Sequence, residues 1–156
     1  MVEIGDAAPL FCLPGADEQE ICLKDYLDRW LVLYFYPRDN TSGCTREAVD
    51  FSAALPHLQD LGAAVLGVSR DSPASHRKFA DKHGLMVTLA SDQDHRVTEA
   101  YGAWALKKMY GKESYGAVRS TFLIDPLGKV AYVWKKVSVK GHADAVAKRL
   151  AELVQK

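Results

Sequence analysis

The most hydrophobic segment of the chain is typical of a buried central strand. Trp30 to Tyr36 is apolar or aromatic at every position and shows no alternation with polar residues. Half-exposed strands alternate, whereas strands buried on both faces are continuous runs rich in branched and aromatic residues. The segment is far shorter than the roughly 20 apolar residues that a membrane-spanning helix needs. We therefore expect Trp30 to Tyr36 to form the central strand of a sheet.

A long helix is predicted after this strand, beyond the loop Pro37 to Gly43. Small and apolar residues recur there at spacings of three and four, which is the helical period: Cys44, Ala48, Phe51, Leu55 and Leu58. This pattern gives the helix one inward face. Pro56 lies inside the pattern, and because proline lacks an amide hydrogen we expect it to kink or split the helix.

Shorter apolar segments predict an N-terminal hairpin and two further strands. Ala8 to Leu13 and Ile21 to Leu23 surround the turn-rich stretch Pro14 to Asp17, which indicates a hairpin that covers one edge of the core. Ala63 to Ser69 and Val87 to Ala90 are the two further strands.

Capping signals place two more helices around the last of these strands. Ser72-Pro73 supplies an N-cap and a first-turn proline for a helix that ends near Gly84. Asp94 opens a short helix toward Tyr101.

The C-terminal third predicts a second hairpin and a last helix. Arg119 to Ile124 and Lys129 to Trp134 flank the turn sequence Asp125 to Gly128, which favours an antiparallel hairpin. A helix then places a set of apolar residues on one face: Ala143, Val146, Ala147, Leu150, Leu153 and Val154. Trp104 to Tyr115, rich in Lys, Gly and aromatic residues, is interpreted as a long loop, although it could form a wall of a site or contact a reductant.

The order of these elements indicates the fold class. Strands that alternate with helices, followed by a hairpin and a helix, predict an α/β sandwich with a mixed central sheet flanked by helices. No repeat or linker divides the sequence, so residues 1–156 are expected to form one domain. Ligands in such folds bind at the carboxyl ends of parallel strands. The loop Pro37 to Cys44 has this position.

Composition and charge exclude several classes of partner. The 156 residues are 48% hydrophobic and 26% charged, and 20 Lys and Arg balance 20 Asp and Glu. With no net charge, the chain is not suited to a nucleic acid backbone or an anionic membrane surface. The N-terminal segment carries Glu3 and Asp6 and lacks the basic and apolar regions of a secretory signal, so a cytoplasmic location is expected.

The start of the long helix is the place where chemistry is expected. Cys44 would lie near unpaired backbone amides and the positive end of the helix dipole, which lower a thiol pKa and favour the thiolate. Pro37, Thr41 and Cys44 follow the order P-x-x-x-T-x-x-C. Pro37 would cover the sulfur from bulk water, and the Thr41 hydroxyl would point at it. The alternatives are that Cys44 is a small buried hydrophobe and that Thr41 is an N-cap whose side chain binds a helix amide.

These residues belong to a longer set of motifs, and with them the chain resembles the peroxiredoxins. Within that family it is similar to the bacterioferritin comigratory protein, or peroxiredoxin Q, group. The resemblance covers nearly the whole chain and is carried by the following segments: Tyr34 to Pro37, Thr41 to Ala48, Leu66 to Ser69, Asp71 to His76, Tyr101 to Trp104, Arg119 to Asp125 and Val139 to His142.

The resemblance implies a thioredoxin-like fold and a thiol-dependent peroxidase. It implies that Cys44 is the peroxidatic cysteine, which reduces hydrogen peroxide and organic hydroperoxides and becomes a sulfenic acid. Thr41 and Pro37 match the motif partners of that cysteine, and Arg119 matches the arginine that a later strand contributes. Glu47 would orient an arginine from elsewhere in the fold. The chemistry requires no metal ion and no organic cofactor.

The sequence departs from many members of this group in its other cysteines. The position five residues after Cys44, which often carries a resolving cysteine, is Val49, and Ser72 to Gly84 contains no cysteine. We therefore expect a one-cysteine enzyme, a monomer or weak dimer, whose sulfenic acid is reduced by thioredoxin, glutaredoxin or glutathione. Cys12 and Cys22 could meet in the hairpin, but a reducing cytoplasm disfavours a disulfide, so both are interpreted as apolar fillers.

Two other functions are alternatives to peroxide reduction for a reactive cysteine in this fold. A peroxide sensor or holdase of the same fold, with incidental turnover, is the main alternative to an enzyme. A thioredoxin-type reductase would need a C-x-x-C pair, of which Thr41-Ser-Gly-Cys44 supplies one cysteine. The five histidines show no metal-ligand spacing and are interpreted as surface or structural residues: His57, His76, His83, His95 and His142.

Overall fold

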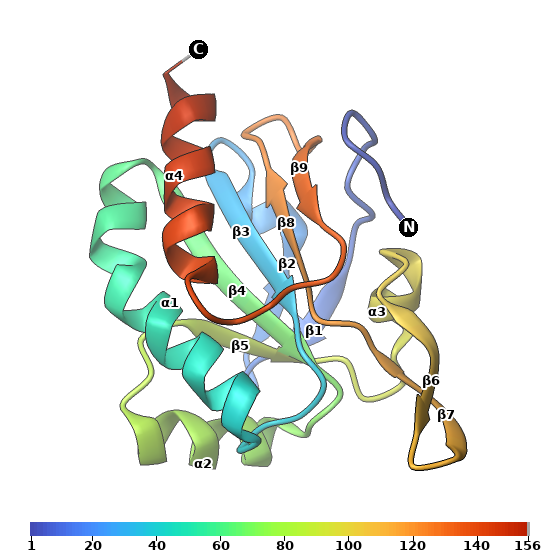
Figure 1. Ribbon diagram of the computed structural model, residues 1–156. Helices are drawn as coiled ribbons and strands as arrows, with labels where there is room; N and C mark the ends of the chain where they lie inside the picture. The colour runs from blue at the N-terminus through green and yellow to red at the C-terminus, as the bar shows by residue number, and fades with distance from the viewer. Residues whose placement is uncertain (156) are drawn as a thin grey trace.

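The computed structural model describes residues 1–155 and builds them around a five-stranded mixed sheet (Figure 1). The strand order is β5 (Thr88–Ser91), β4 (Ala63–Ser69), β3 (Trp30–Phe35), β8 (Ser120–Ile124) and β9 (Val130–Trp134). β3 pairs in parallel with β4 and antiparallel with β8, so the most hydrophobic segment is the central strand, as predicted. The predicted α/β class and mixed sheet are confirmed.

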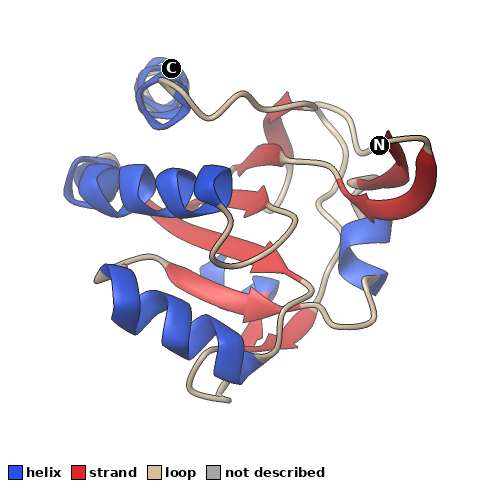
Figure 2. Cartoon of the chain, turned by 60° about the horizontal axis from the view of Figure 1, so that its bottom comes forward, coloured by secondary structure: helices blue, strands red, loops and turns tan. Residues whose placement is uncertain are grey.

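The two faces of this sheet carry different layers. Val32 and Tyr34 of β3 pack in a cluster with the three longer helices, α1 (Ser42–Asp60), α2 (Pro73–His83) and α4 (His142–Val154). Leu33 and Phe35 pack in the opposite cluster, and Figure 2 shows the helices gathered against one side of the sheet. Because successive side chains of a strand point to opposite faces, one continuous apolar strand supplies both cores.

The layer on the other face is made of short elements. The predicted N-terminal hairpin forms from β1 (Cys12–Pro14) and β2 (Glu20–Cys22), followed by a 3₁₀ helix, η1 (Leu23–Tyr26), and later by α3 (Arg96–Ala100). These strands are too short to form a stable sheet alone. Their apolar side chains Leu13 and Ile21 are therefore buried against the central sheet.

The helices α1 and α2 differ in how closely they follow the sequence signals. Ser72 accepts a hydrogen bond from the Ser75 amide at 3.1 Å, and Gly84 ends α2 with a left-handed φ of 59°. In α1, however, the helix continues through Pro56, so the expectation of a split is wrong. Proline removes one helical hydrogen bond, and Leu58 beyond it is fully buried, which keeps the last turns in place.

The interpretation of Trp104 to Tyr115 as a loop is wrong. β6 (Trp104–Met109) and β7 (Lys112–Ala117) form an antiparallel hairpin joined by Tyr110 and Gly111, whose φ angles are 53° and 78°. Two positive φ angles are what a tight two-residue hairpin turn needs. Within the described chain these strands pair only with each other, and with little burial on either face they lack the alternation by which strands are recognised. None of the described helices is both long enough and apolar enough to cross a bilayer.

Candidate active site

Cys44 is the third residue of α1, directly after the loop that leaves β3. Its exposed fraction is 1%, and it packs in the cluster beneath α1. Of the three cysteines, all within the described residues, it is the free one. The position at the start of the helix, at the carboxyl end of a parallel strand, is the one that the sequence indicated.

Arg119 lies beside this sulfur although 75 positions separate the two residues. Phe35 at the end of β3 is opposite Ser120 at the start of β8, so the residue before β8 stands next to the loop after β3. The Arg119 Nη2 donates to Cys44 Sγ at 3.2 Å, and Nη1 donates to Glu47 Oε1 at 2.6 Å. One guanidinium thus bridges the thiol and a carboxylate one turn further along α1.

The electrostatics of this trio follow from burial and mutual attraction. Burial raises the pKa of Glu47 to about 7, although the charge of Arg119 and its hydrogen bond act in the opposite direction. Burial alone would lower the pKa of Arg119, but Glu47 and Cys44 reverse the effect and raise it. Arg119 is therefore a permanent cation at hydrogen-bond distance from the Cys44 sulfur.

Thr41 and Pro37 lie in the chain segment between β3 and Cys44, and the bonding of Thr41 differs from the expected one. Thr41 occupies the N-cap position of α1, but its side chain makes no capping bond to a helix amide. Its hydroxyl donates instead to the Arg38 carbonyl at 3.1 Å, so the side-chain cap interpretation is wrong. Thr41 is exposed and Pro37 half-buried.

A buried carboxylate that the sequence analysis did not single out fastens this loop. Asp39 is 5% exposed. It accepts hydrogen bonds from the Tyr36 hydroxyl at 2.7 Å and the Ser75 hydroxyl at 2.8 Å, and it pairs with His76 Nδ1 at 2.7 Å. His76 Nε2 reaches the Ala90 carbonyl at 3.0 Å. The loop before Cys44 is therefore tied to α2 and β5. No motif marked Asp39; an acidic residue between an apolar strand and a helix is normally solvated.

Comparisons with known proteins identify the family to which this arrangement belongs. A family model described as AhpC/TSA matches residues 4–133 of the chain. The chain belongs to the AhpC/TSA family. Among known members, Peroxiredoxin Bcp of Bacillus subtilis (strain 168) is 43% identical over 155 residues, 99% of each chain. Peroxiredoxin Bcp of Xanthomonas campestris is 50% identical over 124 residues, 80% of this chain and 78% of that protein.

Solved structures of the same group superpose closely on this AhpC/TSA member. The match to Xanthomonas campestris Peroxiredoxin Q has a TM-score of 0.91 at 43% identity and covers 99% of this chain and 98% of that one. The resemblance to the Bcp and peroxiredoxin Q group is thereby confirmed, and so is the thioredoxin-like peroxiredoxin fold. With relatives named peroxiredoxins at this identity and coverage, the protein is a thiol-dependent peroxidase.

The other two cysteines of this peroxiredoxin form a disulfide, so their interpretation as apolar fillers is wrong. Cys12 and Cys22 are directly opposite each other in the N-terminal hairpin, with Cα atoms 4.0 Å apart. The flanking Leu23 amide donates to the Phe11 carbonyl. The cysteine pair therefore falls at a non-hydrogen-bonded position, where facing side chains are closest. The disulfide forms, although a reducing compartment was expected to disfavour it, because strand pairing holds the two sulfurs together.

Two clusters of side chains have the composition of a metal site in this AhpC/TSA member, and both are otherwise engaged. Cys12, Glu20 and Cys22 lie together, but the two sulfurs are joined to each other. Asp39, Asp71 and His76 form the second cluster. There the Asp71 carboxylate accepts from the Asp39 amide at 2.9 Å, and the Asp39 carboxylate is saturated by the loop contacts described above.

Lys107 of β6 is coupled by charge to Arg119 and Cys44, and it lies in the segment Trp104 to Tyr115 that the sequence analysis considered as a wall of a site. Burial lowers the pKa of Lys107, and the positive charge of Arg119 acts in the same direction. A negative charge on Cys44 opposes this effect. A residue of the β6–β7 hairpin is thus part of the electrostatic surroundings of Arg119 in this peroxiredoxin.

Glu47 is expected to act by orienting Arg119. In Glu47→Gln the amide oxygen still accepts from Nη1, so we expect oxidation of Cys44 by peroxide to stay within about threefold of wild type. Glu47→Ala leaves the guanidinium unanchored, and we expect the rate constant to fall about tenfold because alignment at the sulfur is lost. Stopped-flow oxidation measures both. An equal loss in the two variants would show that charge, not orientation, is what Glu47 supplies.

His142 at the start of α4 makes the stability of the protein depend on pH. Burial lowers its pKa to about 4, and the charge of Arg119 acts in the same direction. The folded protein keeps the ring neutral beside Thr121, 2.8 Å away. An unfolded chain binds a proton there below its ordinary pKa of 6.5, so the free energy of unfolding decreases as the pH falls from about 6.5 to 4.

We expect protonation of His142 to lower the free energy of unfolding by on the order of 2 kcal/mol over this pH range. Urea unfolding of wild type and His142→Gln, compared near neutral pH and near pH 4, isolates it, since glutamine has no titrating ring. The remaining titratable groups should change the free energy of unfolding of both proteins by the same amount. Parallel losses of stability in the two proteins would contradict the assignment.

Proposed function

We propose that the protein reduces hydrogen peroxide and organic hydroperoxides with the thiolate of Cys44. The observation that carries the proposal is the contact of Arg119 Nη2 with Cys44 Sγ at 3.2 Å, held in place by the second bond of the same guanidinium to Glu47. The Xanthomonas campestris bacterioferritin comigratory protein, which is 42% identical, was studied for its alkyl peroxide reduction activity, and this supports organic hydroperoxides as substrates.

The first step is a displacement on oxygen. The Cys44 thiolate attacks the terminal peroxide oxygen, an S–O bond forms, and the O–O bond breaks with its electron pair on the departing oxygen. That oxygen takes up a proton and leaves as water or an alcohol, while the sulfur becomes a sulfenic acid. Arg119 and the amides at the start of α1 would meet the charge that develops on the departing oxygen.

Thr41 and Pro37 have supporting roles in this proposal. The Thr41 hydroxyl would hold the peroxide in line with the sulfur, and Pro37 would limit access of bulk water. Because Cys44 is 1% exposed, the contact with Arg119 is made in a poorly hydrated region, where electrostatic attraction is stronger than in water. With so little of Cys44 exposed, neighbouring groups must move before a peroxide can reach the sulfur.

The second step in the proposal is reduction by a thiol from another molecule. An external thiolate attacks the sulfenic sulfur and water leaves. A second thiol then releases Cys44 from the mixed disulfide. The geometry supports a one-cysteine cycle because Cys44 packs in the cluster on one face of the central sheet. The residues that flank the Cys12–Cys22 disulfide, Leu13 and Ile21, pack in the cluster on the other face. Val49, at the usual resolving position, is 41% exposed. Thioredoxin, glutaredoxin and glutathione are the candidate reductants.

Peroxide consumption measured in parallel with these three reducing systems tests the function. We expect catalytic turnover with at least one of them, for hydrogen peroxide and for an organic hydroperoxide. If Cys44 is oxidised but no thiol supports turnover, the protein is a peroxide sensor or holdase instead. The cytoplasmic location, the single domain and the monomeric or weakly dimeric state stay predictions.

The one-cysteine type has its own test. After one equivalent of peroxide, mass spectrometry of the intact protein is expected to find one added oxygen on Cys44 with the Cys12–Cys22 bond retained. A disulfide that includes Cys44 within one chain would replace the one-cysteine type by an internal resolving mechanism.

A further inference from the structure

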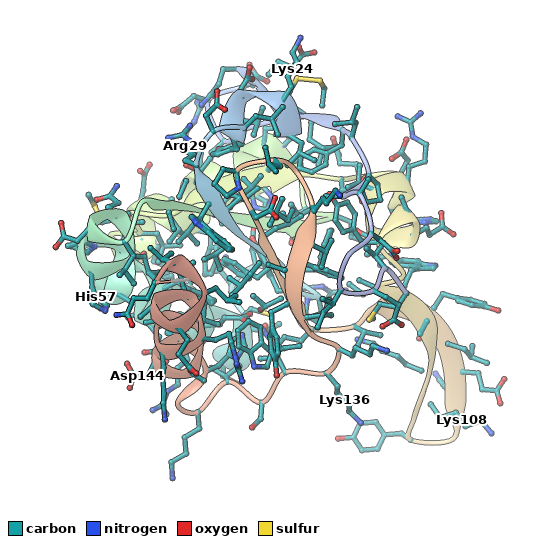
Figure 3. All side chains as sticks on the ribbon, turned by 90° about the horizontal axis from the view of Figure 1, so that it is seen from above. Lys24, Arg29, His57, Lys108, Lys136 and Asp144 are labelled. Carbon is teal, nitrogen blue, oxygen red and sulfur yellow. A yellow bond between two sulfur atoms is a disulfide. The ribbon has the colours of Figure 1, made fainter. Side chains whose placement is uncertain are left out.

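The two sulfurs of the hairpin disulfide differ sharply in accessibility. Cys12 is exposed, whereas Cys22 is 2% exposed. Figure 3 shows the disulfide at the molecular edge beside Lys24 and far from Asp144 at the start of α4. A thiolate from another molecule can therefore approach this bond from outside at Cys12, the exposed residue of the pair.

The surface around Cys12 is apolar and hollowed. Leu10 is 78% exposed, and together with Phe11 and Cys12 it lines two adjoining hollows of about 300 Å³ each. Lys24 borders one hollow and Arg96 the other. We call this surface, Leu10, Phe11, Cys12 and Lys24, the hairpin groove. Lys24 attracts an attacking thiolate, and the exposed Leu10 provides an apolar contact.

The hairpin is held to the protein by interactions that do not involve the disulfide. Leu13 and Ile21 are buried against the central sheet, and Gly15 forms a bridge with Ala90 of β5. Arg77 of α2 donates to the Ala16 carbonyl at 3.0 Å. The disulfide also closes a short loop, since 10 positions separate its cysteines, and short loops gain the least from cross-linking. Anchorage alone does not account for an exposed disulfide in a groove.

We propose that the Cys12–Cys22 disulfide is a second redox site, which a protein dithiol of the thioredoxin type reduces after it docks on the hairpin groove. The inference is independent of the peroxide chemistry proposed for Cys44, which lies in the core cluster on the other face of the sheet. The occupant follows from the groove itself: a partner with a nucleophilic thiol at an apolar surface matches the disulfide, Leu10 and the neighbouring cations.

The exchange balances as a two-electron reduction. The partner thiolate bonds to Cys12 Sγ, the S–S bond breaks, and Cys22 leaves with the electron pair and takes up a proton. Glu20 Oε1 lies 3.5 Å from Cys22 Sγ. The second thiol of the partner then attacks the mixed disulfide. The partner ends as a disulfide and the hairpin as two thiols.

The test uses Cys44→Ser, so that the hairpin pair is the only source of new thiols. Oxidised protein is mixed with reduced thioredoxin or with dithiothreitol, quenched with an alkylating reagent and weighed. We expect thioredoxin to reduce the disulfide of the folded Cys44→Ser protein. Adding Leu10→Asp to this protein should slow the reaction about tenfold, the effect of losing roughly 1.4 kcal/mol of contact. Dithiothreitol, which needs no docking surface, should reduce both proteins at the same rate.

Met86→Asp in the same background is the matched control, because Met86 is 70% exposed and lies after α2, outside the groove. It should leave the thioredoxin rate unchanged. If thioredoxin reduces the pair only after the protein is unfolded, or if Leu10→Asp leaves its rate unchanged, the proposal is wrong. Since Cys44 is absent throughout, neither result bears on peroxide reduction.

Discussion

Replacing Cys44 with serine is expected to abolish peroxide reduction with every reductant. A serine hydroxyl in the same place is a far weaker nucleophile, because it does not ionise near neutral pH and Arg119 has no thiolate to stabilise. Peroxide consumption with the thioredoxin, glutaredoxin and glutathione systems measures the loss. The substitution is nearly isosteric, so the fold around the start of α1 should persist.

The double variant Cys12→Ser/Cys22→Ser is the matched control for this loss. It removes two sulfurs from the face opposite Cys44, and the rate at which peroxide oxidises Cys44 should match that of wild type. Turnover that persists in Cys44→Ser, or is lost in the double variant, would transfer the peroxidatic role to the hairpin cysteines.

Replacing Arg119 with alanine is expected to slow oxidation of Cys44 by about 10² to 10³, the usual cost of a lost transition-state donor. The variant loses the bond to Sγ and the cation that favours the thiolate. We also expect a smaller thiolate fraction at neutral pH, which the ultraviolet absorbance of the thiolate reports. Arg119→Lys should fall between wild type and alanine, because an ammonium keeps the charge but not the two-pronged geometry.

Arg46→Ala is the control for a general loss of positive charge, since Arg46 lies on the same helix with 64% of its side chain exposed. It should leave the oxidation rate within about twofold, as surface charges do. If Arg119→Ala oxidises as fast as wild type, Arg119 has no part in the mechanism.

The elements that the sequence predicted well are those with local causes. Trp30 to Phe35 is apolar throughout because both of its faces are covered, and that information lies within the segment itself. The helix from Pro73 to His83 begins and ends at its own capping residues. The β6–β7 hairpin was missed because its faces are mostly exposed, so the only signal was the two-residue turn at Tyr110 and Gly111.

The site could be predicted only in part, because its contacts depend on strand pairing. Cys44 followed from its position at the start of a helix, whereas Arg119 was suggested by resemblance alone. Its proximity to the thiol arises from the antiparallel pairing of β3 with β8, which no local pattern specifies. The Cys12–Cys22 bond was judged from the redox compartment, although the pairing within the hairpin was the deciding cause.

The buried pair of Asp39 and His76 shows why single residues were hardest to interpret. Each was unremarkable in the sequence, and His76 was grouped with surface or structural histidines. His76 is a structural histidine, not a surface one, since it is fully buried and hydrogen-bonded at both ring nitrogens.

Because of this pair, the thiol of Cys44 and the loop that precedes it are held by different parts of the molecule. Cys44 moves with α1, which packs against α4 and β4, while the loop through Asp39 is attached to α2 and β5. A variant that loosens α1 and a variant that loosens the loop should therefore each raise the activation free energy of Cys44 oxidation. In the double variant the two increases should add, as expected for two independent supports.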